Sequence, residues 1–373
     1  MQVNRNLVGF AAAILTLGLS TVTSTSVQAQ LIRAPLDSGF KRTSSIVMTV
    51  DEMLGSQKGR LPGEPLLGPG FPDLWIAEVQ FKPVRYRRME VTDLKSGEKN
   101  LELVWYMVYR VIPRDFIELA GVDGRDNLLK KLSDTNQLPQ NSIDAMQRYS
   151  LQIPKFTLRT DDSATPVMYM DEVNLEIQRE VLVREFQRRA PDLKLLNSIQ
   201  GITEVVDPVS VDDPDQLSNA FYGVAIWRNV DPRTDYLTVR MEGFCNAYRI
   251  SQNAAGETIV EHKVIEQRFG RPGDEYNQQE DEFRIVDEAR MAPNGDITIV
   301  TETSESTFQN GRPVPPFVDT LRQQIQDKVA NGGAPELSWP SWSYQPRPAA
   351  IKVPDFDKVL RNARIQVQAA PTP

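Results

Sequence analysis

The chain has 373 residues, with 42 Lys and Arg against 50 Asp and Glu, and a formal net charge of −8 at pH 7. Such a mildly acidic protein does not condense on nucleic acid or on an anionic membrane through bulk charge. Its single cysteine excludes an intramolecular disulfide, and one cysteine with one histidine cannot supply a His/Cys zinc cage within one chain.

The first 29 residues predict a secretory signal peptide. Arg5 supplies the positive start, residues 7–19 form an apolar core, and a polar stretch leads to Val27-Gln28-Ala29 with small residues at the positions read at cleavage. The core is shorter than the about 20 residues of a membrane-spanning helix. An uncleaved anchor is the alternative. We expect cleavage after Ala29, no lipid anchor because no cysteine lies nearby, and a periplasmic or extracellular protein without a transmembrane anchor.

A strong β pattern follows a proline- and glycine-rich arm. Residues 75–81 alternate apolar and polar side chains, Pro83 interrupts them, and residues 86–91 resume in shifted phase. That shift indicates a bulge or an edge strand. Residues 101–112 are apolar on both faces, which predicts a central strand of a packed sheet.

Two helices are predicted among the later strands. In residues 171–189 the apolar positions fit a strand, but the Glu180–Arg184 and Glu185–Arg189 spacings fit a helix, which we favour. Residues 317–330 carry one apolar stripe, and we expect this helix to dock on a sheet because its own burial hardly offsets its ordering. The β pattern itself returns at residues 221–227, 236–245, 258–269, 283–287 and 297–301.

These patterns together predict a mainly β fold. We expect two antiparallel β-sandwich-like domains, a few short helices and a proline-rich C-terminal tail. About 150 residues per domain is consistent with two domains. The expected segments are the signal peptide 1–29, the Pro/Gly-rich arm 30–72, a first sandwich-like domain with helical insertions 73–216, a second sandwich-like domain 217–312, and the docked helix and tail 313–373.

Three strings of the chain carry a resemblance. LVWYMVYRV, FYGVAIWRNVDPRTDYLTVRMEGFCNAYRI and RPGDEYNQQEDEFRIV resemble segments of uncharacterised exported proteins from planctomycete-type bacteria. The resemblance extends over residues 73–345. It implies a location in the cell envelope, and it implies no activity, cofactor or catalytic residue.

The single cysteine and histidine predict no catalytic centre. Cys245 shares a strand face with apolar residues, so we expect a buried, inert thiol. His262 lies on the opposite face of a predicted strand from Ile259 and Ile265. A Ser–His–Asp triad would have to use it, but no Gly-x-Ser-x-Gly elbow precedes it. We expect a solvated strand histidine.

Acidic residues are densest between Asp274 and Glu288. Oxygen-rich loops of this kind can hold Ca²⁺, but EF-hand spacing is absent here and at residues 212–215, so a solvated loop and no cofactor are the expectation, with Ca²⁺ as the alternative. The carboxylate pair of a glycosidase cannot be recognised from an inventory of fifty acidic residues.

A basic patch and an aromatic segment are the two candidate binding surfaces. Lys82, Arg85, Arg87 and Arg88 could hold an anionic polysaccharide or an acidic protein; the alternative is charge that keeps an edge strand from aggregating. The aromatic segment comprises Trp339, Trp342 and Tyr344 in a proline-stiffened stretch. Its rings could stack on sugars or fill a partner's groove; the alternative is that they pin the tail to the protein's own sheet.

Nucleotide and nucleic-acid functions have no signature in the chain. The leading hypothesis is a non-enzymatic structural or interaction protein of the cell envelope or periplasm, with an envelope protein or a polysaccharide as partner. The alternatives are a carbohydrate-binding module that uses the aromatic segment and a carboxylate-based polysaccharide hydrolase.

Overall fold

The computed structural model describes residues 76–93, 96–114, 154–162, 165–202, 209, 213–215, 217, 219–245, 248–252, 258–271 and 283–346. The chain divides into the units Met1–Gln30 and Leu31–Pro373, and every described residue belongs to the second unit. The predicted signal peptide, the Pro/Gly-rich arm and the end of the tail lie outside the described residues.

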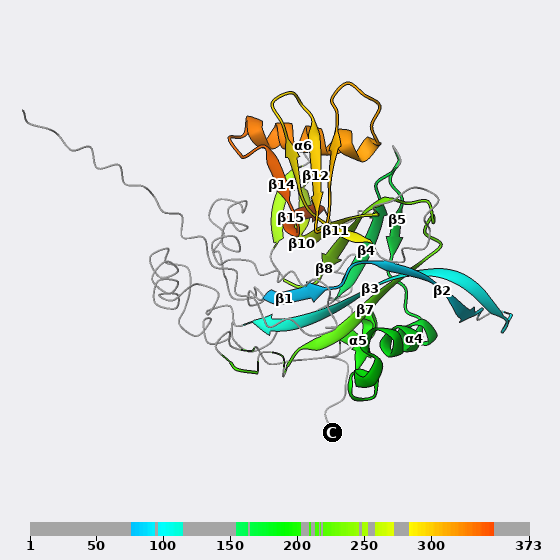
Figure 1. Ribbon diagram of the computed structural model, residues 1–373. Helices are drawn as coiled ribbons and strands as arrows, with labels where there is room; N and C mark the ends of the chain where they lie inside the picture. The colour runs from blue at the N-terminus through cyan, green and yellow to red at the C-terminus, as the bar shows by residue number, and fades with distance from the viewer. Residues whose placement is uncertain are drawn as a thin grey trace, which may run out of the picture. The chain divides into compact units, whose positions relative to one another are not determined.

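A five-stranded sheet is built around β3 (Lys99–Arg114) (Figure 1). One side of β3 pairs with β7 (Phe221–Arg228), and the other pairs in succession with β1 (Ile76–Phe81) and β2 (Arg85–Thr92), all antiparallel. The short β6 (Leu195–Leu196) joins β7 in parallel. The central position predicted for this strand is confirmed, since both of its faces are buried along Val104–Ile112.

A bulge separates β1 from β2. Phe81 pairs with Tyr109 and Arg85 pairs with Tyr106, so the step from 81 to 85 on one strand matches the step from 109 to 106 on β3. The strand therefore carries one extra residue, which is what a bulge is. This confirms the interpretation of the shifted phase around Pro83. Among the described strands β2 pairs only with β3, so it is also an edge strand.

The second sheet has ten strands in the order β13-β12-β11-β10-β8-β4-β5, with β14 on β11 and with β9 and β15 on β10. The long β10 (Thr258–Gly270) is the common partner of four of them: β8 and β9 flank one side, and β15 and β11 flank the other. The remaining bounds are β4 (Lys155–Thr160), β5 (Met168–Met170), β8 (Tyr236–Glu242), β9 (Tyr248–Gln252), β11 (Arg284–Met291), β12 (Ile297–Thr301), β13 (Glu305–Phe308), β14 (Glu336–Ser338) and β15 (Ser341–Pro346).

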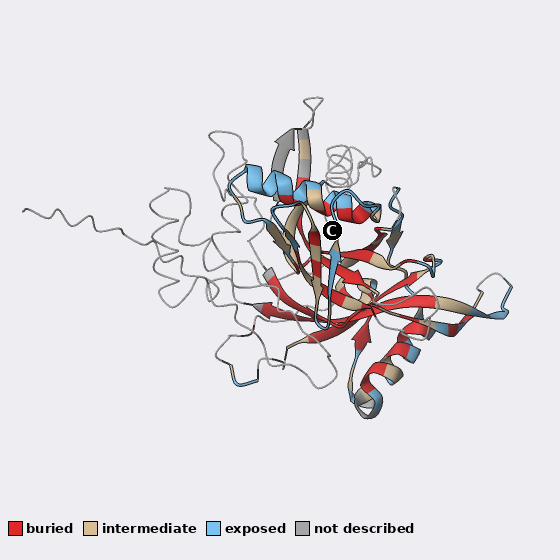
Figure 2. Cartoon of the chain, turned by 45° about the horizontal axis from the view of Figure 1, so that its top comes forward, coloured by how far each residue is buried: buried red, intermediate tan, exposed pale blue. Residues whose placement is uncertain are grey.

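The main hydrophobic core lies between the two sheets, where the buried residues concentrate in Figure 2. Its ring contacts join strands of different sheets: Tyr109 and Phe156 have centroids 4.5 Å apart, and Phe81 and Phe269 are 6.3 Å apart. Rings of this size bury the largest apolar areas in a core. The two sheets are therefore held as one packed unit.

Helices cover the outer faces of both sheets (Figure 1). Helix α4 (Leu175–Phe186) begins at Asn174, whose Oδ1 accepts the backbone N–H groups of Glu176 and Ile177, and its apolar side packs on β3 and β7. It continues as the 3₁₀ turn η3 (Gln187–Asp192), and α5 (Ser198–Ile202) follows β6. Helix α6 (Pro316–Ala330) packs on β11 and β12. Both helix predictions are confirmed, as is the docking of the second.

The β-rich fold class is confirmed, but the division into two sandwich-like domains is not. β3 and β4 belong to the expected first domain, yet they pair with β7 and β8 of the expected second domain. The expected tail also differs, because its residues 336–346 form β14 and β15 and enter the ten-stranded sheet. Periodicity predicts strands and their faces, but it carries no information on which distant strands pair.

Candidate functional site: a cleft beside β2

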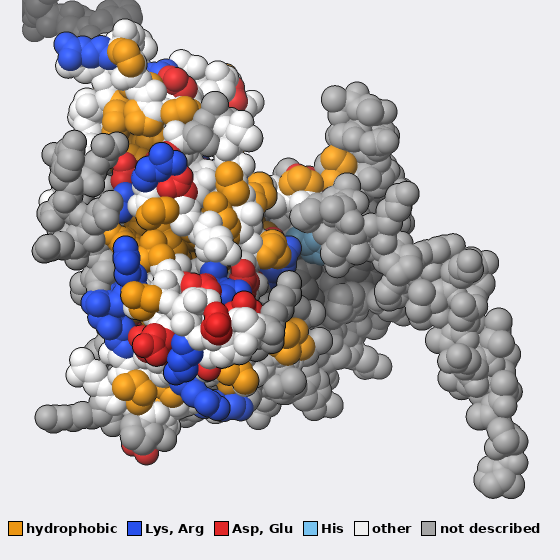
Figure 3. Space-filling view, turned by 90° about the vertical axis from the view of Figure 1, so that its right-hand side faces the viewer, with side chains coloured by type: hydrophobic (Ala, Val, Ile, Leu, Met, Phe, Trp, Pro, Cys, Tyr) orange, Lys and Arg blue, Asp and Glu red, His pale blue; other side chains and the backbone are white. Residues whose placement is uncertain are grey.

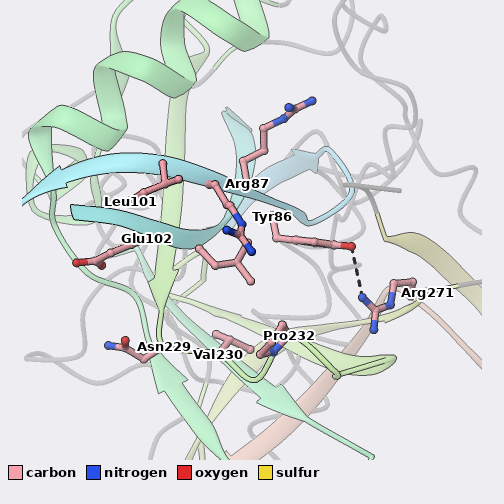
Figure 4. A pocket seen from close by; sticks show the side chains of 10 residues that line it. Tyr86, Arg87, Leu101, Glu102, Asn229, Val230, Pro232 and Arg271 are labelled. Atoms are coloured by element: carbon pink, nitrogen blue, oxygen red, sulfur yellow. Dashed lines mark hydrogen bonds between the residues drawn. The ribbon is translucent and has the colours of Figure 1, made fainter. Parts of the chain in front are cut away.

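A cleft of about 770 Å³ opens where the β2–β3 hairpin projects beyond the ten-stranded sheet (Figure 4). Leu101 and Trp105 lie on the same face of β3, but Leu101 is 63% exposed and Trp105 is fully buried. The second sheet therefore covers only the inner part of the hairpin. The cleft is lined by Tyr86, Arg87, Arg88, Leu101, Glu102, Leu103, Asn229, Val230, Pro232 and Arg271.

The inner end of the cleft is a rigid aromatic cluster. Tyr86 stacks on Trp105 at 5.2 Å between centroids, and Phe283 packs against both rings at 6.2 and 5.2 Å. All three residues are buried, so their positions are fixed by the core and not by a ligand. This gives the cleft a preformed floor.

Arg271 forms a fixed cationic corner of the cleft. Its Nε and Nη2 donate to Asp235 Oδ1 at 3.0 and 2.8 Å, and its Nη1 donates to the Tyr86 hydroxyl at 3.4 Å, the bond drawn in Figure 4. The guanidinium also lies 5.9 Å from the Tyr86 ring centroid. Burial opposes the charged form of Arg271, but the hydrogen bonds to Asp235 and Tyr86 outweigh it and raise the pKa. The side chain therefore stays charged and oriented.

Arg88 is a second cation of the cleft, and its charge is not neutralised within the described part of the chain. It is exposed, and it makes no hydrogen bond or ion pair with any residue that the structure describes. Arg87 lines the cleft beside it. The one carboxylate in the described lining is Glu102, which Arg228 Nη1 already binds at 3.1 Å. Asp235 balances the charge of Arg271, so Arg88 is the cation that offers an unbalanced positive charge at the described lining.

The opposite wall is a tight turn between β7 and β8. Asn229 adopts a left-handed backbone with φ of +60°, which asparagine tolerates better than most residues. Asp231 accepts bonds from the backbone and the guanidinium of Arg233, and the Asp231 carbonyl accepts the N–H of Thr234. These bonds hold Val230 and Pro232 in place as an apolar wall.

Comparison with protein-family models, with characterised proteins and with solved structures finds no match. The resemblance to exported planctomycete-type proteins therefore stays a prediction, and the site is interpreted from its own chemistry.

The structure splits the predicted basic patch into two parts. Lys82 Nζ and Arg85 Nη1 bind Glu185 of α4 at 2.8 and 2.5 Å, and the Tyr106 hydroxyl donates to the same carboxylate at 2.9 Å. Although burial disfavours its charge, Arg85 and Lys82 hold the pKa of Glu185 below its usual range. These two cations hold the helix on the sheet, and only Arg87 and Arg88 of the patch reach the cleft.

The aromatic segment packs against the protein itself. Trp339 is 8% exposed beneath α6, with the Arg268 guanidinium 5.0 Å from its ring centroid. Trp342 packs against the main core, and the Lys263 ammonium lies 5.0 Å from the Tyr344 ring centroid. These contacts favour the alternative that the segment is pinned to its own sheet. Sugar binding by these residues stays a prediction.

The remaining candidates add no chemistry to the cleft. Cys245 is buried, as predicted, and His262 is half-buried in β10. Of the dense acidic run, Asp287 and Glu288 lie in β11, and Asp274, Glu275 and residues 280–282 lie outside the described ranges. Within those ranges no three His, Cys, Asp or Glu side chains are grouped as metal ligands would be. Nor does any described helix combine the length and apolar character needed to cross a bilayer.

Sequence reasoning missed Arg271, Asn229 and Val230 as cleft residues. Asn229 and Val230 follow β7, whereas Arg271 follows β10. They reach the hairpin through the pairing of β3 with β7 and through the contact of Arg271 with Tyr86. The one signal present in the sequence was the turn chemistry of Asn229, Asp231 and Pro232, which marks a tight loop but not its neighbours.

Proposed function

We propose that this chain is an exported, non-enzymatic interaction protein of the cell envelope or periplasm, and that the cleft beside β2 binds its partner. The observation that carries the proposal is a preformed cleft with a fixed Arg271, an apolar wall and an Arg88 that no described residue neutralises. Arginine and tyrosine are enriched among the residues that dominate binding energy at interfaces. Figure 3 views the side toward which the hairpin projects and shows basic, acidic and hydrophobic side chains next to one another there.

The lining favours a protein partner with acidic groups. Guanidinium groups bind carboxylates with paired, charge-assisted hydrogen bonds. Leu101 and Leu103 add partly exposed apolar surface that gains from burial against apolar side chains of a protein. The hydroxyls of a polysaccharide would leave this surface without an apolar partner. An acidic segment of an envelope protein meets both requirements.

The same lining supports binding in preference to hydrolysis. Glycoside hydrolysis by carboxylates needs two such groups facing each other across the scissile bond. Among the described lining residues Glu102 is the single carboxylate, and it is engaged by Arg228. A carbohydrate module built on Trp339 would require its buried ring to become accessible.

Affinity capture from native envelope extract tests the proposal. The wild-type chain should recover a stoichiometric protein that elutes at raised salt. An Arg88→Glu/Leu101→Asp variant should lose it, because it reverses the exposed charge and removes the exposed apolar side chain. Arg312→Glu is the matched control for charge reversal, since Arg312 is exposed and lies outside the lining. Equal recovery by the cleft variant, or a lone monomer every time, would refute the proposal.

Export is tested separately by cell fractionation. We expect a shortened chain that begins at Gln30 in the periplasmic or external fraction. An intact precursor in the cytosol would contradict the exported part of the proposal while leaving the cleft chemistry unaffected.

A further inference from the structure

The outer edge of β2 carries backbone groups that the described part of the fold leaves open. In an antiparallel pair, successive residues turn their N–H and C=O groups alternately toward the partner strand and away from it. The N–H of Asp93 donates to Glu98 O across the hairpin at 2.8 Å, so Asp93 turns toward β3. The N–H of Thr92 donates instead to the Glu176 carboxylate of α4 at 3.0 Å. The backbone N–H and C=O groups of residues 86, 88, 90 and 92 therefore point away from β3.

The two ends of this edge are already occupied. At one end the carbonyl of Val84 accepts the N–H of Phe283 at 2.8 Å, and at the other end Glu176 holds Thr92. Between them the backbone groups of Tyr86, Arg88 and Glu90 have no hydrogen-bond partner among the described residues. The open stretch of five residues is about 16 Å long at 3.3 Å per residue.

Such an edge is a template for another strand. Charged side chains on natural edge strands prevent unwanted pairing with other chains, and Arg88 has this effect on strands that are basic or neutral. Against an acidic chain the same arginine is an attraction. The edge also lies directly beside the cleft, because Tyr86 and Arg88 belong to both. An edge that the described residues leave open, with a pocket for alternate side chains beside it, is the arrangement that strand-adding recognition domains use.

We propose that an acidic segment of the partner, in extended conformation, adds to β2 as a further strand. Its backbone pairs with Tyr86, Arg88 and Glu90, and every second side chain enters the cleft. Carboxylates at these positions meet Arg88, whose charge no described residue balances, whereas Arg271 is paired with Asp235 and Glu102 with Arg228. This inference rests on the proposed function and specifies how the partner binds.

The probe is a fluorescein-labelled octapeptide that alternates glutamate with valine, and its binding is measured by fluorescence anisotropy. Its matched analogue has the same sequence with alternate backbone nitrogens methylated, which removes edge-facing donors and keeps the charge. We expect the parent peptide to bind the full chain and the methylated peptide to bind about tenfold more weakly or worse. Dextran sulfate serves as the polysaccharide probe.

Glu90→Pro separates backbone pairing from charge attraction. Proline removes an outward N–H that the β2–β3 ladder does not use, as edge positions allow. Glu90→Gln removes the same negative charge and keeps the N–H. Strand addition predicts that Glu90→Pro weakens peptide binding about tenfold while Glu90→Gln leaves it equal or tighter. Thermal unfolding of both variants shows whether the fold is retained.

The outcomes distinguish this inference from the proposed function. If Glu90→Pro and Glu90→Gln bind alike, and methylation changes nothing, strand addition is refuted while Arg88-dependent binding still stands. If the wild-type chain binds neither peptide, or binds dextran sulfate alone, strand addition by an acidic segment is refuted, and the affinity capture decides the proposed function by itself. Should Glu90→Pro unfold, the difference in affinity between the parent and methylated peptides on the wild-type chain still tests strand addition.

Discussion

Replacing Glu185 by glutamine should destabilise the protein more than any surface substitution on the same helix. The Glu185 side chain is 1% exposed, and it is the shared partner of Lys82 and Arg85, whose side chains are 3% and 20% exposed. Glutamine keeps the size of the side chain but leaves two cations in a partly desolvated site without a counter-charge. Removing one partner from a buried ion pair costs about 3–5 kcal/mol. Because Arg85 is partly exposed, we expect the lower end of that range.

The assay is urea denaturation at pH 7. The free energy of unfolding is compared between variants whose m-value, its slope against urea concentration, is the same. Glu180→Gln, on an exposed position of α4, is the control and should change stability by less than about 0.5 kcal/mol. A Lys82→Met/Glu185→Leu double variant should recover part of the loss, because it removes the buried Lys82 charge together with its partner. A loss below about 1 kcal/mol for Glu185→Gln, or one equal to that of the control, would refute the reasoning.

The same pair predicts a pH dependence. The pKa of Glu185 lies below its usual range because of Arg85 and Lys82, although burial alone would raise it. A carboxyl with a depressed folded-state pKa contributes stability that is present above its unfolded pKa and lost as the pH falls through the folded value. Acid unfolding of the wild-type chain should therefore be steeper than that of Glu185→Gln.

Three further outcomes are expected. Gly223→Ala should lower the free energy of unfolding by about 1–3 kcal/mol in thermal unfolding, because the new Cβ would lie 2.2 Å from the Tyr109 ring; unchanged stability would show that this ring can move to make room. Burial raises the pKa of Asp162 from 3.8 to about 6, so its carboxylate form is disfavoured in the folded state, and stability should fall as the pH rises from about 4 to about 6, a slope that Asp162→Asn should flatten. Trp339→Ala should cost about 3–5 kcal/mol by undocking α6 without altering cleft binding, and a loss of binding in anisotropy would place the site elsewhere.

Local features of the fold were predictable wherever neighbouring residues decide them. Three predictions rest on short sequence windows, and each is confirmed: the apolar residues on both faces of β3, the phase shift at Pro83 and the apolar stripe of α6. The helical spacing at Glu185 also predicted α4. Yet this side chain turns to Lys82 and Arg85, which lie about a hundred residues earlier in the chain.

The cleft was only half predictable because its parts meet through long-range pairing. Arg87 and Arg88 stood out as a cluster of like charge, but Arg271 has no such neighbours in sequence. Its place depends on the salt bridge with Asp235 and on Phe283 returning to the edge at Val84. Likewise, the sequence left open whether Trp339 and Trp342 pin the tail or bind a partner, and the pairing of β14 and β15 with β11 and β10 favours pinning.

The extra residue between Phe81 and Arg85 decides which side chains the hairpin offers to its surroundings. It inverts the facing of the residues that follow in the strand, so Tyr86 packs into the aromatic cluster, with the exposed Arg88 on the same face, while Arg85 turns toward α4. A one-residue deletion there would exchange these two sets, sending guanidinium groups into the core and the tyrosine ring against the helix. The length of this short connection is therefore as much a determinant of the surface that the cleft presents as the identity of the arginines.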